Sequence, residues 1–326
     1  KVKKFNNHEL QALELRYHPP IETQDDSTTV KLTQDLTQQI IDSFDTEVPH
    51  TFDEHDITQL IKTVEFLGKY SCYISDSFDL WTQKCKLCDS NYSISSYVMD
   101  NIKIDRPKVD KGSKIEEVLR AISSIIRLQS AKENQHLILT IVIALTRIFR
   151  AFRAPGLSDM KDVWNFIKTC FASPLREVRM LTVKILPLLI HVPEDAQYES
   201  DIDTIMSFLF SITLERRNYY VFEGYISTLG ELLMVKAVDS RYYIILRQLI
   251  LFMAETSEFI SNLSIFQLKQ VATTKNMTPW KIVEPFIPLI SRDVVKSYKK
   301  TSGLLENFCI AIEMSQRVFL TRTLSY

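Results

Sequence analysis

Apolar residues recur at helical spacing along most of the chain that follows Val30. The first runs are Leu32, Leu36, Ile40, Ile41 and Phe44, and then Ile57, Leu60, Ile61, Val64 and Leu67. Residues three and four positions apart share one face of an α-helix, so this spacing predicts amphipathic helices. No alternating pattern bounded by hairpin turns competes with it. We therefore predict an all-α chain.

The clearest helix is expected between Ser173 and Asp195, where Ser173 suits the N-cap and Pro174 the first helical position. Its apolar face should hold Val178, Leu181, Ile185 and Leu189, and Pro187 should kink the last turn. About four such side chains, at ~2 kcal/mol each, do not offset ~1.5 kcal/mol per ordered residue. This helix therefore needs neighbours on both flanks.

Comparable helices are expected to begin near Ala131, after Pro174, after Arg217, after Thr256 and after Ser302. These starts lie roughly 39 to 46 residues apart, close to the ~40–47-residue period of HEAT repeats. The predicted fold is an α-solenoid of HEAT-type antiparallel helix pairs, in which each pair completes its core against its neighbours. Residues Gln135 to Phe149 are apolar nearly all round and should form an inner-layer helix.

Breaks in the pattern divide the chain into four expected segments. Residues 1–30 should be a poorly packed N-terminal segment and linker, 31–104 irregular helical repeats, 105–113 a loop, and 114–326 HEAT-type repeats. The chain opens on Lys1 without a signal-like apolar region, and it stops at Tyr326 without a tail-like composition. We expect it to be a segment of a larger protein.

Composition narrows the classes of function. With 45% hydrophobic and 24% charged residues and a net charge of −1, no global field draws the chain to nucleic acid or an anionic membrane. The apolar runs are shorter than the ~20 residues of a membrane span. Five cysteines at irregular positions indicate a reducing compartment. Cys85 and Cys88 form a CxxC pair without the second ligand pair of a zinc site, so we expect no metal.

Motifs for catalysis are absent from the sequence. It has no glycine-rich phosphate loop, no HExxH and no GxSxG, and its six glycines are scattered. We expect no catalytic and no cofactor-binding residue, and we interpret His136 and His191 as structural. The acidic pairs Glu116–Glu117 and Asp201–Asp203 are expected to begin helices, where negative charge is favourable.

Three basic clusters are candidates for contact with a protein partner or nucleic acid. The first is a row at helical spacing, Arg147, Arg150 and Arg153; the second is Arg216, Arg217, Tyr219 and Tyr220 at a turn; the third is Lys296, Lys299 and Lys300. Tyrosine rings can stack on the bases of single strands. The structural alternatives are solvated turn residues and, for the tyrosines, helix packing.

The stretch NMTPWKIVEPFIPLISRDVVKSY predicts a corner between helices. Thr278 suits an N-cap and Pro279 the first helical position, whereas Pro285 and Pro288 should interrupt the helix, which restarts at Ser291. We expect a structural plug made by Trp280, Pro285, Phe286 and Pro288, with the aromatic rings and Ile290 inserted between flanking helices. The alternative is a ligand pocket.

The longer run FQLKQVATTKNMTPWKIVEPFIPLISRDVV, Phe266 to Val295, resembles a segment of the ATR-type checkpoint kinases of the phosphatidylinositol-3-kinase-related class. In that family the segment lies in a helical-repeat region called the UME domain, N-terminal to the kinase domain. Two upstream pieces, LREVRMLTVKILPLLI and STLGELLMV, occur there in the same order. Residues 160 to 300 carry the resemblance.

The resemblance implies a non-catalytic scaffold segment of a nuclear Ser/Thr protein kinase of the DNA-damage and replication checkpoint and DNA repair. It implies an ATRIP-like regulatory subunit as partner, a homodimer of such heterodimers, and indirect contact with DNA through the partner. ATP and Mg would belong to the parent kinase domain, which this sequence lacks.

Two other interpretations differ in class. A stand-alone HEAT-type nucleic-acid-binding or transport adaptor is favoured by the Arg147 row and the tyrosine-rich turn. An enzyme active within these residues is favoured by no constellation of side chains.

Overall fold

The computed structural model describes residues 54–74, 78–79, 84–85, 106–128, 133–190, 196–212, 219–235, 241–298 and 303–323. The predictions for residues 1–53 and 86–105, which include Cys88, and those for His191, Arg216, Arg217, Lys299 and Lys300 lie outside these ranges. The side chain of Lys296 lies outside the description as well.

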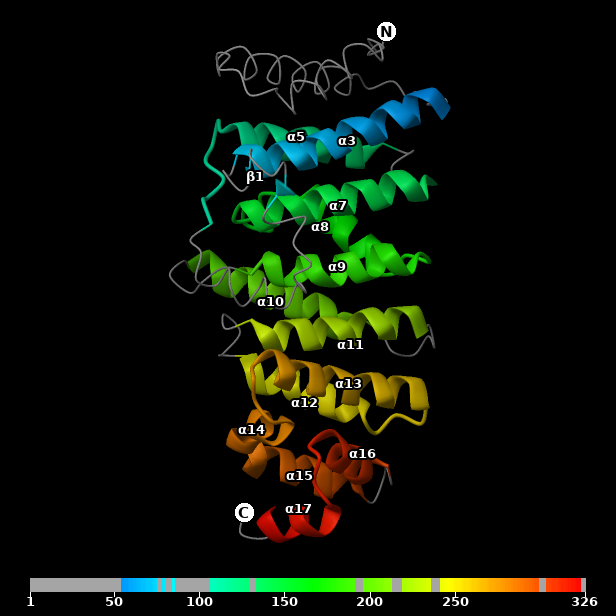
Figure 1. Ribbon diagram of the computed structural model, residues 1–326, viewed down its shortest axis with the longest axis vertical. Coiled ribbons are helices and arrows are strands. Elements are labelled where there is room, and N and C mark those ends of the chain that lie inside the picture. Colours follow the sequence, from blue (N-terminus) through cyan, green and yellow to red (C-terminus); the bar gives the residue numbers. More distant parts are fainter. Residues whose placement is uncertain are drawn as a thin grey trace. The chain divides into compact units, whose positions relative to one another are not determined.

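Helices dominate the described part of the chain, and the all-α prediction is confirmed (Figure 1). A short antiparallel ribbon, β1 (Phe78–Asp79) with β2 (Lys84–Cys85), is the strand structure in these ranges. The helices are α3 (Glu54–Ile74), α5 (Lys114–Arg127), α7 (Gln135–Ala151), α8 (Lys161–Cys170), α9 (Arg176–Leu188), α10 (Ala196–Ser211), α11 (Tyr219–Met234), α12 (Tyr242–Phe252), α13 (Glu258–Thr274), α14 (Pro279–Val283), the 3-10 helix η2 (Glu284–Phe286), α15 (Ile287–Tyr298), α16 (Leu304–Ala311) and α17 (Gln316–Thr323).

The chain forms two compact units. Of the described residues, those from 54 to 85 and from 106 to 170 belong to unit 1, and those from 171 to 323 belong to unit 2. Residues 106–113 are non-helical, as the sequence predicts for a loop there. The loop nevertheless lies within unit 1 and does not divide two units, because α3 packs its apolar face on α5 and α7.

The described part of unit 1 is built around three helix contacts that bury the faces the sequence predicts. The apolar side chains of α7 include Leu137, Ile141 and Leu145, none of which is exposed to solvent. Helix α3 packs along α7, and α5 packs against both α3 and α8. At the end of α5, Arg127 donates two hydrogen bonds to Asp162 of α8, at 2.9 and 2.7 Å.

Unit 2 consists of two layers of helices in sequence order. Helix α11 packs against α9 and α13, and α13 packs against α16 (Figure 1). The helices between them in sequence make the second layer: α12 packs on α11 and α13, and α15 packs on α16. Successive helix pairs therefore complete each other's cores, as predicted for HEAT-type repeats.

Side-chain hydrogen bonds between equivalent helices of neighbouring repeats show the length of one repeat in residues. In one layer, Arg179 on α9 bonds Glu223 on α11, 44 residues away, and Asn307 on α16 bonds Ser261 on α13, 46 residues away. In the other layer, Arg241 at the start of α12 bonds Asp203 on α10, 38 residues away. The predicted interval of roughly 40 residues is thus confirmed.

Neighbouring helices of the first layer run in the same direction. The residue pairs that show it, in order along each helix, are Arg179–Glu223 and the electrostatic neighbours Lys184–Glu231 for α9 and α11, Tyr219–Phe259 and Gly230–Gln267 for α11 and α13, and Ser261–Asn307 for α13 and α16, followed by Lys269 with Glu313 just beyond the end of α16. In each pair a later residue on one helix meets a later residue on the next. This is the arrangement of one helix repeated along a stack.

Helix α9 begins two residues later than predicted. Arg176 is its first residue, and the hydroxyl of Ser173 accepts from the N–H of Leu175 instead of capping a helix begun at Pro174. The reason is the buried Arg179 side chain, which donates to the carbonyls of Ser173 and Pro174. Pro187 lies in the last turn of α9, as predicted.

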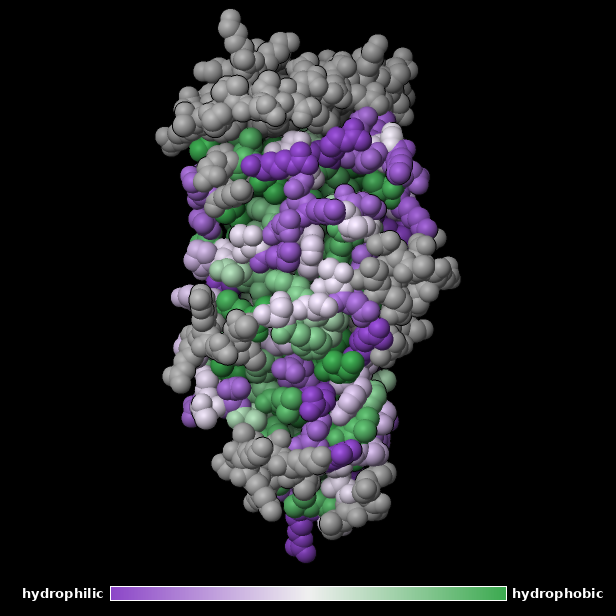
Figure 2. All heavy atoms as spheres, turned by 180° about the vertical axis from the view of Figure 1, so that it is seen from behind, coloured by the Kyte–Doolittle hydropathy of each residue, from purple (hydrophilic) through white to green (hydrophobic). Residues whose placement is uncertain are grey.

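Large apolar side chains that reach solvent in unit 2 are scattered over several helices, including Phe210, Ile244, Phe266, Leu289 and Ile310. In Figure 2, hydrophobic surface is correspondingly broken up by hydrophilic side chains. Isolated apolar residues of this kind are ordinary on protein surfaces.

Candidate functional site

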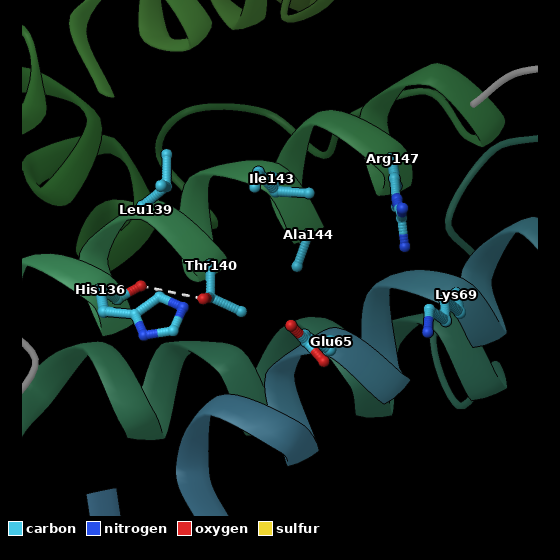
Figure 3. Close-up of a pocket in the computed structure, with 8 residues that line it drawn as sticks. All are labelled: Glu65, Lys69, His136, Leu139, Thr140, Ile143, Ala144 and Arg147. Carbon is cyan, nitrogen blue, oxygen red and sulfur yellow. Dashed lines mark hydrogen bonds between the residues drawn. The ribbon is translucent and has the colours of Figure 1, made fainter. Parts of the chain in front are cut away.

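A groove on unit 1 lies between α3 and α7, and three of the charged side chains that line it form no ion pair with another described residue. Its volume is about 200 Å³ (Figure 3). The lining residues are Glu65 and Lys69 from α3, and His136, Leu139, Thr140, Ile143, Ala144 and Arg147 from α7. Helices α3 and α7 form the two facing walls of the groove, which is open at the protein surface.

Small residues make the close helix crossing beneath the groove. A Cβ added to Gly68 on α3 would stand 2.9 Å from the Cα of Ala144 on α7 and 3.5 Å from the Cδ of Arg147. Lys69 follows Gly68 in sequence, and Arg147 lies about one turn beyond Ala144. The crossing therefore brings the two cations to the same end of the groove.

The charges along the groove are unevenly placed. In Figure 3, Lys69 and Arg147 lie at one end, His136 lies at the other, and the carboxylate of Glu65 projects between them. The Thr140 hydroxyl donates to the His136 carbonyl at 2.9 Å and is thereby oriented along its own helix. Among the described residues, Glu65, Lys69 and Arg147 form no ion pair and no side-chain hydrogen bond.

The predicted row Arg147, Arg150 and Arg153 does not exist as one exposed stripe. Helix α7 ends at Ala151, and the buried Phe152 follows as its C-cap. Arg153 therefore lies beyond the helix, where its N–H donates to the carbonyl of Pro107 at 3.0 Å. Only Arg147 lines the groove.

The tyrosine pair begins α11 in unit 2. Tyr219 and Tyr220 are 53% and 55% exposed. Tyr219 meets Phe259 edge-to-face with ring centroids 6.4 Å apart, and the Arg179 guanidinium lies 4.5 Å from the centroid of the Tyr220 ring. One face of the Tyr220 ring is thus covered by a cation.

A buried ion pair beneath Tyr220 was not predicted from the sequence. Arg179 is 1% exposed, and its Nη2 donates to the Glu223 carboxylate at 2.9 Å; Arg176 donates to the other carboxylate oxygen at 2.8 Å. Partial burial raises the pKa of Glu223, but the hydrogen bonds from Arg176 and Arg179 outweigh it and hold that pKa below its usual value. The available signal was the position of Arg179 four residues after Leu175, on the predicted apolar face.

A second carboxylate of α11 has the opposite character. Glu231 is buried, and its Oε2 has no hydrogen-bond partner in the described structure. Burial raises its pKa, and the neighbouring Lys184 offsets this only partly. This side chain faces a helix interface and not the groove.

The proline corner forms largely as predicted at its start. The Thr278 hydroxyl accepts from the N–H of Lys281, and Pro279 is the first residue of α14. Pro285 lies in η2, where the helix changes to the 3-10 form. The predicted restart at Ser291 is wrong: α15 begins at Ile287, because a proline such as Pro288 is tolerated in the first turn of a helix.

The predicted plug is made by other side chains than expected. Trp280 is only half-buried; its indole N–H donates to Glu284 at 3.0 Å, and Arg322 lies 5.3 Å from its ring centroid. Phe286 stacks on Tyr242 and Tyr243, with ring centroids 5.8 and 5.7 Å away.

Pro285 and Pro288 are exposed. The buried side chains of the corner are Pro279, Ile282, Val283, Ile287 and Ile290. The core of the corner is therefore mainly aliphatic, and Trp280 covers it from outside.

Of the two acidic pairs, one is placed as predicted. Glu116 lies in the first turn of α5, where its carboxylate accepts from the N–H of Gly112 at 2.5 Å, and this bond lowers its pKa. Asp201 and Asp203 do not begin a helix, because α10 already starts at Ala196. Asp203 instead pairs with Arg241 at 3.2 Å.

No group of three or more His, Cys, Asp or Glu side chains in the described residues is placed to hold a metal ion. Within the same residues, no helix combines the length and apolar character needed to cross a membrane.

Repeated helix pairs, joined laterally by ion pairs one repeat apart, define a helical-repeat protein of the HEAT class. Comparison with known sequences identifies the family within this class. The chain belongs to the family described as MEC1-like, HEAT repeats, which matches residues 3–321.

Curated relatives are fungal protein kinases. The chain is 24% identical over 282 residues to the serine/threonine-protein kinase MEC1 of Candida albicans, a match that covers 83% of the chain and 12% of that kinase. It is 23% identical over 170 residues to the protein kinase rad3 of Schizosaccharomyces pombe, covering 52% of the chain and 7% of the kinase. The chain thus corresponds to a small, HEAT-repeat part of these relatives.

Proposed function

We propose that this chain is the non-catalytic helical-repeat scaffold of an ATR-type Ser/Thr protein kinase of the DNA-damage and replication checkpoint. Its role is to hold an ATRIP-like regulatory subunit and to support the dimer and the placement of the kinase domain. The assignment of residues 160–300 to a UME region, action in the nucleus with a part in DNA repair, and contact with DNA through the partner belong to the same proposal.

The observation that carries the proposal is the family match over residues 3–321. The lateral bonds of unit 2 give it a physical basis, because a stack of helix pairs presents a long surface whose shape depends on each interface. Such a surface suits the binding of another protein. ATP and Mg would be used by a kinase domain elsewhere in the parent protein.

A test uses the full-length parent protein, purified from its own cells with its partners. In the Glu223→Lys variant, a cation faces the buried Arg179, so the α9–α11 interface should loosen. We expect less regulatory subunit to co-purify, and fewer dimers by mass photometry, than with Glu306→Lys, which reverses an exposed glutamate on α16.

Two outcomes would contradict the proposal. Absence of ATP- and Mg-dependent phosphorylation by the wild-type parent protein would refute the assignment to a kinase. Undiminished partner and dimer in a Glu223→Lys protein with a lowered melting temperature would refute the scaffold role.

A further inference from the structure

We propose that the α3–α7 groove is a docking site for an acidic segment of a protein partner, with a carboxylate held between Lys69 and Arg147. The inference rests on the geometry of unit 1 and holds whether or not the parent protein is a kinase.

The first argument is charge. Lys69 and Arg147 lie at one end of the groove, and neither has an ion-pair partner in the described structure. Elsewhere in unit 1 a comparable arginine, Arg127, is satisfied by Asp162 at 2.7 Å. Two neighbouring cations that form no ion pair with a described residue, even with Glu65 in the same groove, favour an added anion, and a guanidinium beside an ammonium can share the two oxygens of one carboxylate.

The second argument is the lining between the charged ends. Ala144 is buried at the floor, and Ile143 is 37% exposed on the wall beside Leu139. A volume of about 200 Å³ accepts a few side chains. An apolar side chain next to the carboxylate would cover Ile143, so the matching segment carries acidic and apolar residues together.

The third argument favours protein over nucleic acid. Binding of a phosphate backbone uses a succession of cations. Here the carboxylate of Glu65 projects into the same groove, one turn before Lys69, where it would repel a second phosphate. Arg150 is not among the residues that line the groove, and Arg153 lies beyond the end of α7 at Ala151. A peptide satisfies Glu65 instead, since its backbone N–H groups or a hydroxyl can donate to it.

The experiment is fluorescence anisotropy with the full-length protein at low ionic strength. The probe is a short fluorescein-labelled peptide with Glu and Leu at helical spacing; its comparison probes carry Gln or Lys in place of Glu, and a labelled oligo-dT tests nucleic acid. We expect the Glu peptide to bind, the Gln and Lys peptides to bind at least about tenfold more weakly, and added salt to weaken binding.

Variants localise the binding. Lys69→Glu and Arg147→Glu should each weaken the Glu peptide at least about tenfold, and the double variant should bind the Lys peptide instead. Lys161→Glu on α8 and Arg292→Glu on α15, both exposed, should leave binding unchanged. If a charge-reversal variant has a lowered melting temperature, the neutral variants Lys69→Gln and Arg147→Gln are used in its place. We expect them to lose less affinity for the Glu peptide than the charge reversals.

Each other outcome overturns the inference. It fails if wild-type protein does not bind the Glu peptide, if oligo-dT binds as well as the peptide and is lost in the same variants, or if the control reversals weaken the peptide equally. The test of the scaffold proposal changes Glu223 in unit 2, whereas the test of the groove changes residues of unit 1. A negative result for peptide binding can therefore be distinguished from a negative result for the scaffold proposal.

Discussion

Arg179 is the residue whose environment departs furthest from its type, because a guanidinium is rarely 1% exposed. It is accommodated by the carbonyls of Ser173 and Pro174, by the Glu223 carboxylate, and by the face of the Tyr220 ring. The arrangement ties the segment before α9 to the first turns of α11. A buried ion pair adds little net stability compared with an apolar pair. We therefore expect this ion pair to act mainly by determining which surfaces of α9 and α11 pack together.

Replacing Glu223 by Gln should therefore destabilise unit 2 at neutral pH by about 2 kcal/mol, because Arg179 stays buried without its anion. Urea unfolding followed by circular dichroism measures this. The matched control is Glu306→Gln, an exposed site where we expect less than ~0.5 kcal/mol.

The same pair has a pH signature. Since the pKa of Glu223 is lowered in the folded protein, its contribution is fully present above the unfolded value of about 4.3. It is lost as pH falls through the lower, folded pKa. The stability gap between wild type and Glu223→Gln should thus shrink on acidification, and a gap that is constant down to pH 3 would contradict the assignment.

At the scale of the helix, the α3–α7 crossing depends on Gly68. Glycine normally weakens a helix interior relative to alanine by ~1 kcal/mol. Here it permits a backbone approach that any Cβ would block, since the added atom would lie 2.9 Å from the Cα of Ala144. Main-chain atoms of α7 cannot rotate away as a side chain can.

We expect Gly68→Ala to destabilise unit 1 by about 1–3 kcal/mol despite the better helix propensity of alanine. Gly303→Ala, where the added Cβ meets only the Asn307 amide nitrogen at 3.6 Å, is the control. Thermal melting compares them, and a Gly68→Ala protein as stable as wild type would mean that the helices are not held so closely.

Helix ends show how much of the elements the sequence could predict. The side chains of Thr278 and Glu116 accept hydrogen bonds from N–H groups three and four residues away. Sequence rules for helix capping, which consider only such near neighbours, therefore predicted the starts of α14 and α5 correctly. The start of α9 depends on Arg179, whose acceptor Glu223 is 44 residues away, and no local rule contains that contact. The α3–α7 groove was missed for the same reason, although Arg147 was among the residues singled out.

For the whole molecule, periodicity was sufficient to predict the HEAT-type stack, because each helix pair interacts mainly with its neighbours. Periodicity did not place the division into two units. The division falls between α8 and α9, and it reflects which helices pack on one another, a property of packing and not of spacing.

Buried thiols can report on each unit separately. Cys170 in unit 1 and Cys309 in unit 2 are both buried, and burial raises their pKa values to about 12 and about 11. At pH 8 almost no thiolate is present, so we expect iodoacetamide to modify neither cysteine in native protein. Mass spectrometry along a urea series should show each label appear as its own unit unfolds. Rapid native labelling of either residue would contradict its burial.

The common direction of α9, α11, α13 and α16 has an electrostatic consequence. Parallel helix dipoles side by side bring their positive poles together along one edge of unit 2. Glu177 lies in the first turn of α9 and Glu258 in the first turn of α13. Their carboxylates offset the positive poles, so removing both of them would make this edge more attractive to anions.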